Sequence, residues 1–276
     1  MTLNDLFKIL KEANIDAPQK TLDVLTAFVL GIEESEVVSR RLMGRLSLDE
    51  KQLSALYELV KQRISGVPLQ YITGTCDFYG LRFKTRPNVL IPRPDTEILV
   101  EQALKFVEDG YCVLDLCTGT GCIGISLATE RAVFCTLADI NEDALALASE
   151  NARDCGVSDR VRVINHNVFS DTFSEKFSLI VSNPPYIPTG DIQSLDIEVQ
   201  NEPHSALDGG SDGLDFYRTI TERYKDNLFP GGALMFELGI GQADDVAAIF
   251  EKNGYSNIKM QKDYNNIIRV ISAVKA

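Results

Sequence analysis

The sequence contains no tryptophan, only two histidines, and six cysteines that nowhere form a Cys-x-x-Cys pair. Zinc sites need cysteines or histidines at close, paired spacing, so we expect no metal and six reduced, mostly buried thiols. No apolar run is long enough to span a bilayer, and the first residues lack the basic-then-apolar layout of a signal peptide. These absences favour a cytoplasmic protein without membrane association.

The formal net charge of −13 is unevenly distributed along the chain. Residues 1–72 carry 9 basic and 10 acidic side chains, whereas residues 73–276 carry 18 and 30. An acidic region repels a phosphate backbone, so this pattern argues against a nucleic-acid substrate. The length of 276 residues is enough for one catalytic domain and a smaller helical one.

Apolar residues in the first seventy positions recur three or four apart, which is the spacing of helices with one buried face. The recurring positions are Leu3, Leu6, Phe7 and Leu10, then Leu22, Leu25, Phe28 and Val29. Ser47-Leu48-Asp49-Glu50 has the pattern of a capping box, which predicts that a further helix starts after Ser47. We expect residues 1–72 to form a small helical bundle that serves recognition rather than chemistry.

The pattern changes from helical to mixed after Gly74. Residues 78–83 predict a β-hairpin, so we assign residues 73–92 as a hairpin linker and residues 93–276 as a second domain. From Pro94 onward, helices alternate with short apolar strands, which favours an α/β, Rossmann-like domain with a mostly parallel sheet. The expected strands are Cys112–Leu116, Phe134–Ala138, Val161–Ile164, Leu179–Ser182, Ala233–Leu238 and Ile267–Val274.

A glycine-rich loop, Cys117-Thr118-Gly119-Thr120-Gly121, follows the first of these strands. Its glycines let the backbone turn sharply beside a ligand, and Gly124 lets the next helix lie close to the sheet. Asp115 precedes the loop, where it can meet an ammonium group or fix the loop amides. Asp139 ends the next strand, where it can accept both ribose hydroxyls. Together these features are more typical of an S-adenosylmethionine pocket than of a dinucleotide crevice.

The end of the third strand is expected beside the adenine ring of such a cofactor. Asn167 can bond the exocyclic amine, while Val168 and Phe169 line the ring. His166 is expected to be a surface or helix-adjacent side chain. In the preceding segment, Asn141 caps a helix that ends near Gly156.

The fourth strand leads into Asn183-Pro184-Pro185-Tyr186 at its carboxyl end, where open α/β sheets bind ligands. The prolines hold the backbone rigid, so the Asn183 Oδ1 and the Pro184 carbonyl become two fixed acceptors. Two acceptors on the hydrogens of a planar –NH2 group return electron density to its nitrogen and aim it at a methyl donor, while Tyr186 packs on its face. The tetrapeptide predicts methyl transfer to an amide or exocyclic amine without a general base.

An irregular stretch from Tyr186 to about Gly213 follows, and loops of this length are usually lids or binding loops. We expect it to shape the wall of the cleft. Within it, Glu202 has either a structural role or a contact with substrate.

Several segments resemble the HemK/PrmC family of protein-(glutamine-N5) methyltransferases, and the likeness covers essentially the whole chain. The segments are Gly66–Gly74, Val89–Glu97, Asp115–Gly121, Asn183–Tyr186 and Glu202–Gly213. The resemblance implies a class I S-adenosylmethionine-dependent methyltransferase domain and an N-terminal bundle that grips peptide-chain release factors. It implies methylation of the glutamine of their Gly-Gly-Gln loop, and we expect the enzyme to be a monomer.

The resemblance also assigns residues to the site. It implies that the cofactor is bound by Cys117, Thr118, Gly119, Thr120, Gly121, Asp139, Val168 and Asn183, to which the strand-end position adds Asn167. The substrate glutamine is held by the catalytic residues Asn183, Pro184, Pro185 and Tyr186, and Arg93 and Thr96 form the wall near the methionine end. Three positions depart from the family pattern: Asn167 stands where Asp is frequent, Val168 where an aromatic is common, and Cys117 where Gly is frequent. We expect the first two to reshape or weaken adenine contacts without abolishing binding.

Three alternatives remain open. A glutamine methyltransferase acting on a ribosomal protein would have the same pocket and a different N-terminal domain. An adenine-N6 methyltransferase also attacks through a planar –NH2 group, although the acidic catalytic domain argues against it. A cofactor-binding interaction protein without turnover would not need the acceptors at 183 and 184.

Overall fold

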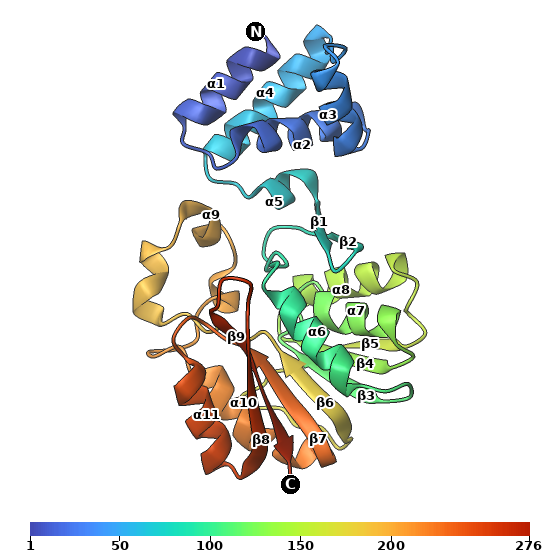
Figure 1. The fold of residues 1–276 in the computed structure, drawn as a ribbon, viewed down its shortest axis with the longest axis vertical. Coiled ribbons are helices and arrows are strands. Elements are labelled where there is room, and N and C mark those ends of the chain that lie inside the picture. The colour runs from blue at the N-terminus through green and yellow to red at the C-terminus, as the bar shows by residue number, and fades with distance from the viewer. The chain divides into compact units, whose positions relative to one another are not determined.

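Residues 1–74 and residues 197–201 form a helical unit, and residues 75–196 and 202–276 form a unit built on a sheet. The structure is a computed structural model that describes residues 1–276 (Figure 1). No helix is both long and apolar enough to cross a membrane.

The helical unit buries the apolar positions that the helical spacing predicts. Its helices are α1 (Leu3–Glu12), α2 (Pro18–Leu30), α3 (Glu34–Leu42), α4 (Glu50–Ile64), α5 (Leu69–Thr73) and α9 (Ile197–Gln200). The core consists of Leu6, Leu10, Leu22, Leu25, Leu56 and Val60. Phe28 differs from the prediction because its side chain is half exposed.

Helix α4 begins later than predicted, because Asp49 rather than Ser47 is its N-cap. The Asp49 carboxylate accepts the Gln52 N–H at 2.8 Å, and the Gln52 side chain accepts the Asp49 N–H at 2.9 Å. The sequence therefore contains two overlapping capping-box patterns. An acidic N-cap also interacts favourably with the helix dipole, which a serine hydroxyl does less well.

Residues 197–201 are held to the helical unit by polar contacts. Arg63 is buried and forms an ion pair with Glu198. The Asn201 amide donates to the Gly66 carbonyl at 3.0 Å. These contacts explain why a short segment from the middle of the chain belongs with residues 1–74.

The second unit contains a hairpin and a seven-stranded sheet. The hairpin pairs β1 (Thr75–Phe78) with β2 (Leu81–Lys84), and the sheet has the order β5-β4-β3-β6-β7-β9-β8. Its strands are β3 (Cys112–Leu116), β4 (Phe134–Asp139), β5 (Val161–Asn165), β6 (Phe177–Ser182), β7 (Leu228–Glu237), β8 (Tyr255–Lys262) and β9 (Ile268–Lys275). Strands β3 to β7 are parallel, and β8 and β9 are antiparallel. The sequence-based prediction missed β8, an edge strand in which only Tyr255 is buried.

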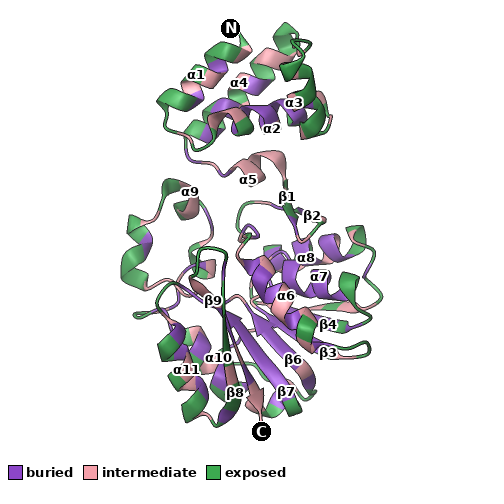
Figure 2. Cartoon of the chain, viewed as in Figure 1, coloured by how far each residue is buried: buried purple, intermediate pink, exposed green.

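Successive residues of each central strand enter separate cores on the two faces of the sheet. Val113 packs in one core with α6 (Thr96–Phe106), α7 (Cys122–Glu130) and α8 (Glu142–Asp154). Leu114 packs in the other core, with α10 (Asp215–Arg223) and α11 (Ala243–Lys252). Figure 2 shows buried strands between helices with exposed outer faces. The expected α/β, Rossmann-like fold with a mostly parallel sheet is confirmed.

The remaining elements of this unit are three short 3₁₀ helices. They are η1 (Thr189–Ser194), η2 (His204–Ala206) and η3 (Lys225–Asn227). The first two lie in the stretch between Tyr186 and Gly213 that the sequence predicts to be irregular.

Candidate active site

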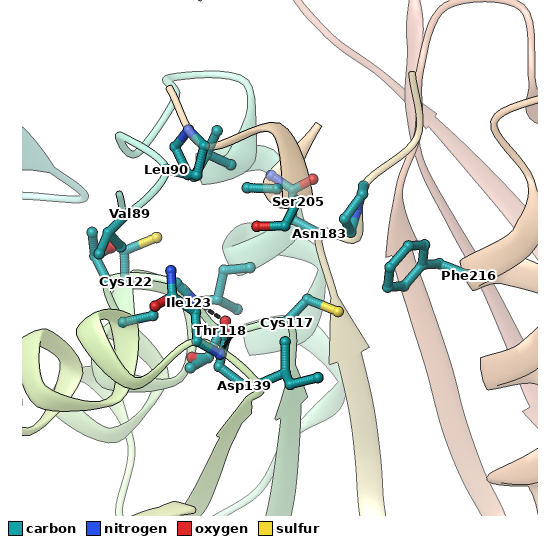
Figure 3. Close-up of a pocket in the computed structure, with 18 of the residues that line it drawn as sticks. Val89, Leu90, Cys117, Thr118, Cys122, Ile123, Asp139, Asn183, Ser205 and Phe216 are labelled. Carbon is teal, nitrogen blue, oxygen red and sulfur yellow. Dashed lines mark hydrogen bonds between the residues drawn. The ribbon is translucent and has the colours of Figure 1, made fainter. Parts of the chain in front are cut away.

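A cavity of about 290 Å³ lies where β3, β4, β5 and β6 end (Figure 3). The predicted site residues that line it are Cys117, Thr118, Gly119, Thr120, Asp139, Asn167, Val168, Asn183 and Pro185. Gly121, Pro184 and Tyr186 do not line it. Further lining residues that the prediction did not assign include Val89, Leu90, Cys122, Ile123, Ile140, Ser205 and Phe216. The structure thus brings together residues from four strand ends and two loops.

The glycine-rich loop has a backbone that needs its glycines. Gly119 and Gly121 have φ of +56° and +82°, a region that favours glycine. Cys117 also has a positive φ, +58°, at the position where a glycine is frequent in the resembled family. Asp139 holds the loop, because its Oδ2 accepts the Gly119 N–H at 2.9 Å while its Oδ1 accepts the Asn141 N–H at 2.9 Å. Burial raises the pKa of Asp139, and these backbone hydrogen bonds oppose the rise.

Asp115 forms a hydrogen bond to the glycine-rich loop but does not line the cavity. Its Oδ2 accepts the Thr118 hydroxyl at 2.7 Å and the Gly124 N–H, in the first turn of α7, at 3.0 Å, so it holds the loop through a hydroxyl and the start of the helix rather than through loop amides. The side chain is fully buried, and its Oδ1 has no hydrogen-bond partner. Burial raises the pKa of Asp115 to about 7. A Cβ on Gly124 would lie 2.3 Å from Leu137 Cδ2, which confirms the close approach of helix and sheet.

Of the two positions expected for His166, the surface is wrong, whereas a place beside a helix is confirmed, since the ring contacts Tyr224 at the end of α10. The His166 ring is buried, forms a hydrogen bond to the Tyr224 hydroxyl at 2.7 Å, and stacks on Phe173 with a centroid distance of 4.3 Å. Burial lowers the pKa of His166. Its neighbours Asn165 and Asn167 are polar, so nothing beside it in the sequence indicates that Phe173 and Tyr224 pack on its ring.

Asn167 is already engaged with the backbone of its own turn. Its Oδ1 accepts the Phe169 N–H at 2.9 Å, and its own N–H donates to Asp171 at 2.8 Å. Phe169 packs edge-to-face on Phe216 with a centroid distance of 4.8 Å. Phe216 comes from α10, a helix that carries no motif, and the sequence therefore offered no signal for its place in the wall.

The tetrapeptide 183–186 is held on several sides. The Asn183 Nδ2 donates to Thr96 Oγ1 at 3.2 Å, and the Tyr186 carbonyl accepts Gln242 Nε2 at 2.9 Å. A Cβ on Gly209 would lie 2.7 Å from Tyr186 Cα, and one on Gly213 would lie 2.3 Å from the Tyr186 carbonyl oxygen. The segment 209–213 therefore packs directly on this backbone.

Glu202 has a structural role. It is buried, accepts the Ile91 N–H at 3.0 Å, and forms an ion pair with Arg93. These contacts hold residues 88–93, which line the cavity, against the chain just before η2. Both alternatives for Glu202 were open from sequence, because its two partners lie more than a hundred positions earlier.

Comparisons with known proteins agree with this architecture. The family model described as the methyltransferase small domain matches residues 84–210, and that of the PrmC N-terminal domain matches residues 2–74. A release factor glutamine methyltransferase from Clostridium acetobutylicum is 38% identical over 98% of this chain and 95% of its own. One from Geobacter sulfurreducens is 45% identical over 81% and 79%. The crystal structure of a methyltransferase from Pyrococcus furiosus matches 83% of this chain and all of its own with a TM-score of 0.56 at 19% identity, a likeness of fold.

Proposed function

Because the chain belongs to the release factor glutamine methyltransferase family, we propose that it transfers a methyl group from S-adenosylmethionine to the glutamine side-chain nitrogen in the Gly-Gly-Gln motif of a peptide-chain release factor. The observation that carries the proposal is the placement of Asn183 on the wall of a cavity that the glycine-rich loop also lines. The names of the relatives favour this substrate over a ribosomal protein or an adenine base.

The residues that line the cavity suit both the polar and the apolar parts of S-adenosylmethionine. The loop 117–121 brings backbone close to the cavity, and Asp139 keeps lone pairs on both oxygens for ribose hydroxyls. Asn167 and Val168 would face the adenine ring, and Arg93 and Thr96 line the cavity as expected for the methionine end. When bound, the cofactor supplies an electrophilic methyl group on a sulfonium.

The chain's own contribution is to bind and orient the substrate amide. Asn183 donates through Nδ2 to Thr96, which leaves its Oδ1 as an acceptor for one hydrogen of the glutamine –NH2 group. The Pro184 carbonyl accepts the other from a substrate side chain that lies beside the cofactor cavity, because Pro184 does not line the cavity itself. Each of these hydrogen bonds stabilises a nitrogen that becomes positive as it is methylated, by about 1.5–3 kcal/mol, so losing one costs about 10- to 100-fold in rate. The nitrogen becomes acidic only then, so its proton can leave to water.

The helical unit is proposed to recognise the body of the release factor. The PrmC N-terminal model matches it, and the relatives from Clostridium and Geobacter carry the release factor in their names. A monomeric state and a cytoplasmic location remain predictions from sequence.

A transfer assay tests the proposed function. Purified protein and radiolabelled S-adenosylmethionine are incubated with a bacterial release factor, with the same factor carrying Gln→Ala in its Gly-Gly-Gln loop, with ribosomal proteins, and with DNA. We expect label only in the unaltered release factor. Equal labelling of the Gln→Ala factor, or labelling of DNA or a ribosomal protein instead, would overturn the assignment.

A further inference from the structure

We propose that Glu237 is a positioning residue that sets the orientation of the Asn183 side-chain amide. The inference rests on the proposed function and adds a residue that no motif indicates. It concerns the groups behind Asn183, on the side away from the cavity.

Glu237 and Asn183 emerge from neighbouring strands at the same edge of the sheet. Ser182, the last residue of β6, lies opposite Phe236 of β7 in a parallel pairing. Asn183 and Glu237 are the next residues of the two strands. The Glu237 side chain is buried and does not line the cavity, whereas Asn183 does. The carboxyl group is therefore covered by the residues that form the cavity wall.

The polar side chains next to this carboxyl group include Asn183 and its hydrogen-bond partner Thr96. Asn183 Nδ2 donates to Thr96 Oγ1 at 3.2 Å. The Thr96 and Asn183 side chains also lie near the Glu237 carboxyl group and favour its ionised form. The Glu237 Oε2 atom is buried and has no hydrogen-bond partner. Thr96 is itself buried, so the three side chains form a small polar cluster behind the cavity wall, which Thr96 and Asn183 help to line.

An ionised carboxylate can only accept hydrogen bonds, and this property selects one orientation of the amide. The amide N–H end is attracted to the carboxylate, while the amide oxygen is repelled by it and is directed to the cavity. Reversal of the amide would turn N–H donors toward the hydrogens of the substrate –NH2 group. Asn183 could then no longer act as an acceptor. A neutral side chain at position 237 offers no such discrimination, because a glutamine presents both an oxygen and an –NH2 group.

The charge state of Glu237 is set by its surroundings. Burial raises the pKa of Glu237 to about 7, and the nearby charge of Asp95 adds to the rise, whereas the bonds from Thr96 and Asn183 and the charge of Arg269 oppose it. Arg269 is shared with two other carboxylates, Asp95 at 3.1 Å and Asp263 at 3.3 Å. The other titratable groups that sense Glu237 are Tyr186, Tyr217 and Cys122. When protonated, Glu237 gains an O–H that can donate to the amide oxygen and stabilise the reversed orientation.

The test compares wild type with Glu237→Gln in release-factor methylation at saturating substrates from about pH 5.5 to 9. We expect the substitution to lower kcat about 10-fold or more at neutral pH, while the Kd for S-adenosylmethionine changes less than about 3-fold. We also expect wild-type kcat to decline below about pH 7, with a smaller decline in the variant. Wild-type kcat in Glu237→Gln, or the same acid decline in both proteins, would overturn the proposal.

Two threonine variants keep the test decisive if Glu237→Gln does not fold. Thr96→Val removes the hydroxyl that accepts from the Asn183 amide and should lower kcat measured at saturating S-adenosylmethionine. Thr221→Val is the matched control, because Thr221 is equally buried and its Oγ1 has no partner. It should leave kcat unchanged, and full activity of Thr96→Val would count against the polar cluster. If wild type labels no release factor, the proposed function fails; if wild type labels it and the variants match it, only the positioning role fails.

Discussion

Glu202 and Arg93 form an ion pair in which the carboxylate is buried and the guanidinium is about one-third exposed. The same carboxylate accepts the Ile91 N–H. A single side chain therefore binds both a backbone N–H and a guanidinium of the loop that lines one wall of the cavity. Arg93 belongs to the Ile-Pro-Arg-Pro segment that the family resemblance picks out.

Glu202→Ala should destabilise the sheet unit by about 1–3 kcal/mol, because it leaves a buried N–H and a partly buried guanidinium without their acceptor. Glu202→Gln keeps the acceptor and should cost less. Urea unfolding followed by circular dichroism measures both. Glu58→Gln is the control, since its ion pair with Lys61 lies at the surface and its loss should not be detectable. Equal stability of Glu202→Ala and wild type would contradict the role assigned to Glu202.

Gly124→Ala should destabilise the protein by about 1–3 kcal/mol, because the added Cβ would lie 2.3 Å from Leu137 Cδ2 and helix α7 would have to move. Gly190→Ala is the matched control, since its Cβ would meet nothing within 4 Å and its φ is not positive. Thermal unfolding of the two variants checks the prediction. A further Leu137→Ala change should make the Gly124→Ala substitution less damaging, and a strictly additive loss would show that the clash is not the cause.

The folded chain should lose stability relative to Asp115→Asn as pH rises from about 4 to about 7. Burial raises the pKa of Asp115 from 3.8 to about 7, so in this range the folded state holds a proton that the unfolded chain has released. The stabilising contribution is complete below about pH 4 and is lost as pH rises through about 7, with a size of about 1–4 kcal/mol. Urea unfolding at several pH values measures it. Parallel curves for wild type and Asp115→Asn would show that Asp115 is ionised throughout.

Asn183→Ala should lower kcat by about 10- to 100-fold or more, because it removes one acceptor from the substrate amide. Its affinity for S-adenosylmethionine should stay within a few-fold of wild type. Calorimetric titration of the cofactor together with the methylation assay separates the two effects. Loss of cofactor binding with retained kcat would assign Asn183 to the cofactor alone.

Asn167→Asp should strengthen cofactor binding by about 2- to 10-fold, because the second carboxylate oxygen can accept the adenine amine while the first keeps its bond to the Phe169 N–H. Titration with S-adenosylmethionine and with its product, S-adenosylhomocysteine, measures the change. Weaker binding of both would mean that the existing Asn167 amide donates to the ring instead.

The sequence predicted those helices and strands in which the spacing of apolar residues matches the burial of their side chains. The parallel strands alternate with helices and end in motifs, so their order along the chain was readable. Strand β8 was missed because its side chains are mostly exposed, so it lacks the apolar pattern by which the other strands were predicted. The start of α4 was misplaced by overlapping capping patterns that only the backbone geometry distinguishes.

The motif residues of the candidate site could be predicted from the sequence, whereas the residues that pack around them could not. Residues after strand ends, such as Asp139 and Asn183, follow from topology alone. Phe216 and Glu237 lie in segments without motifs, and His166 packs against Tyr224, which is 58 residues later in the sequence. Their roles depend on which helix covers which strand end, and no local pattern contains that information.

The helical unit is not contiguous in the chain, because Arg63 finds its counter-ion in Glu198, 135 residues later. During synthesis, the first four helices leave the ribosome while this buried arginine still has no acidic partner, and most of the sheet must be translated before Glu198 emerges. The N-terminal fragment alone would therefore be a weakened version of the unit. A protease cut after Gly74 would leave residues 197–201, which belong to the helical unit, on the C-terminal fragment.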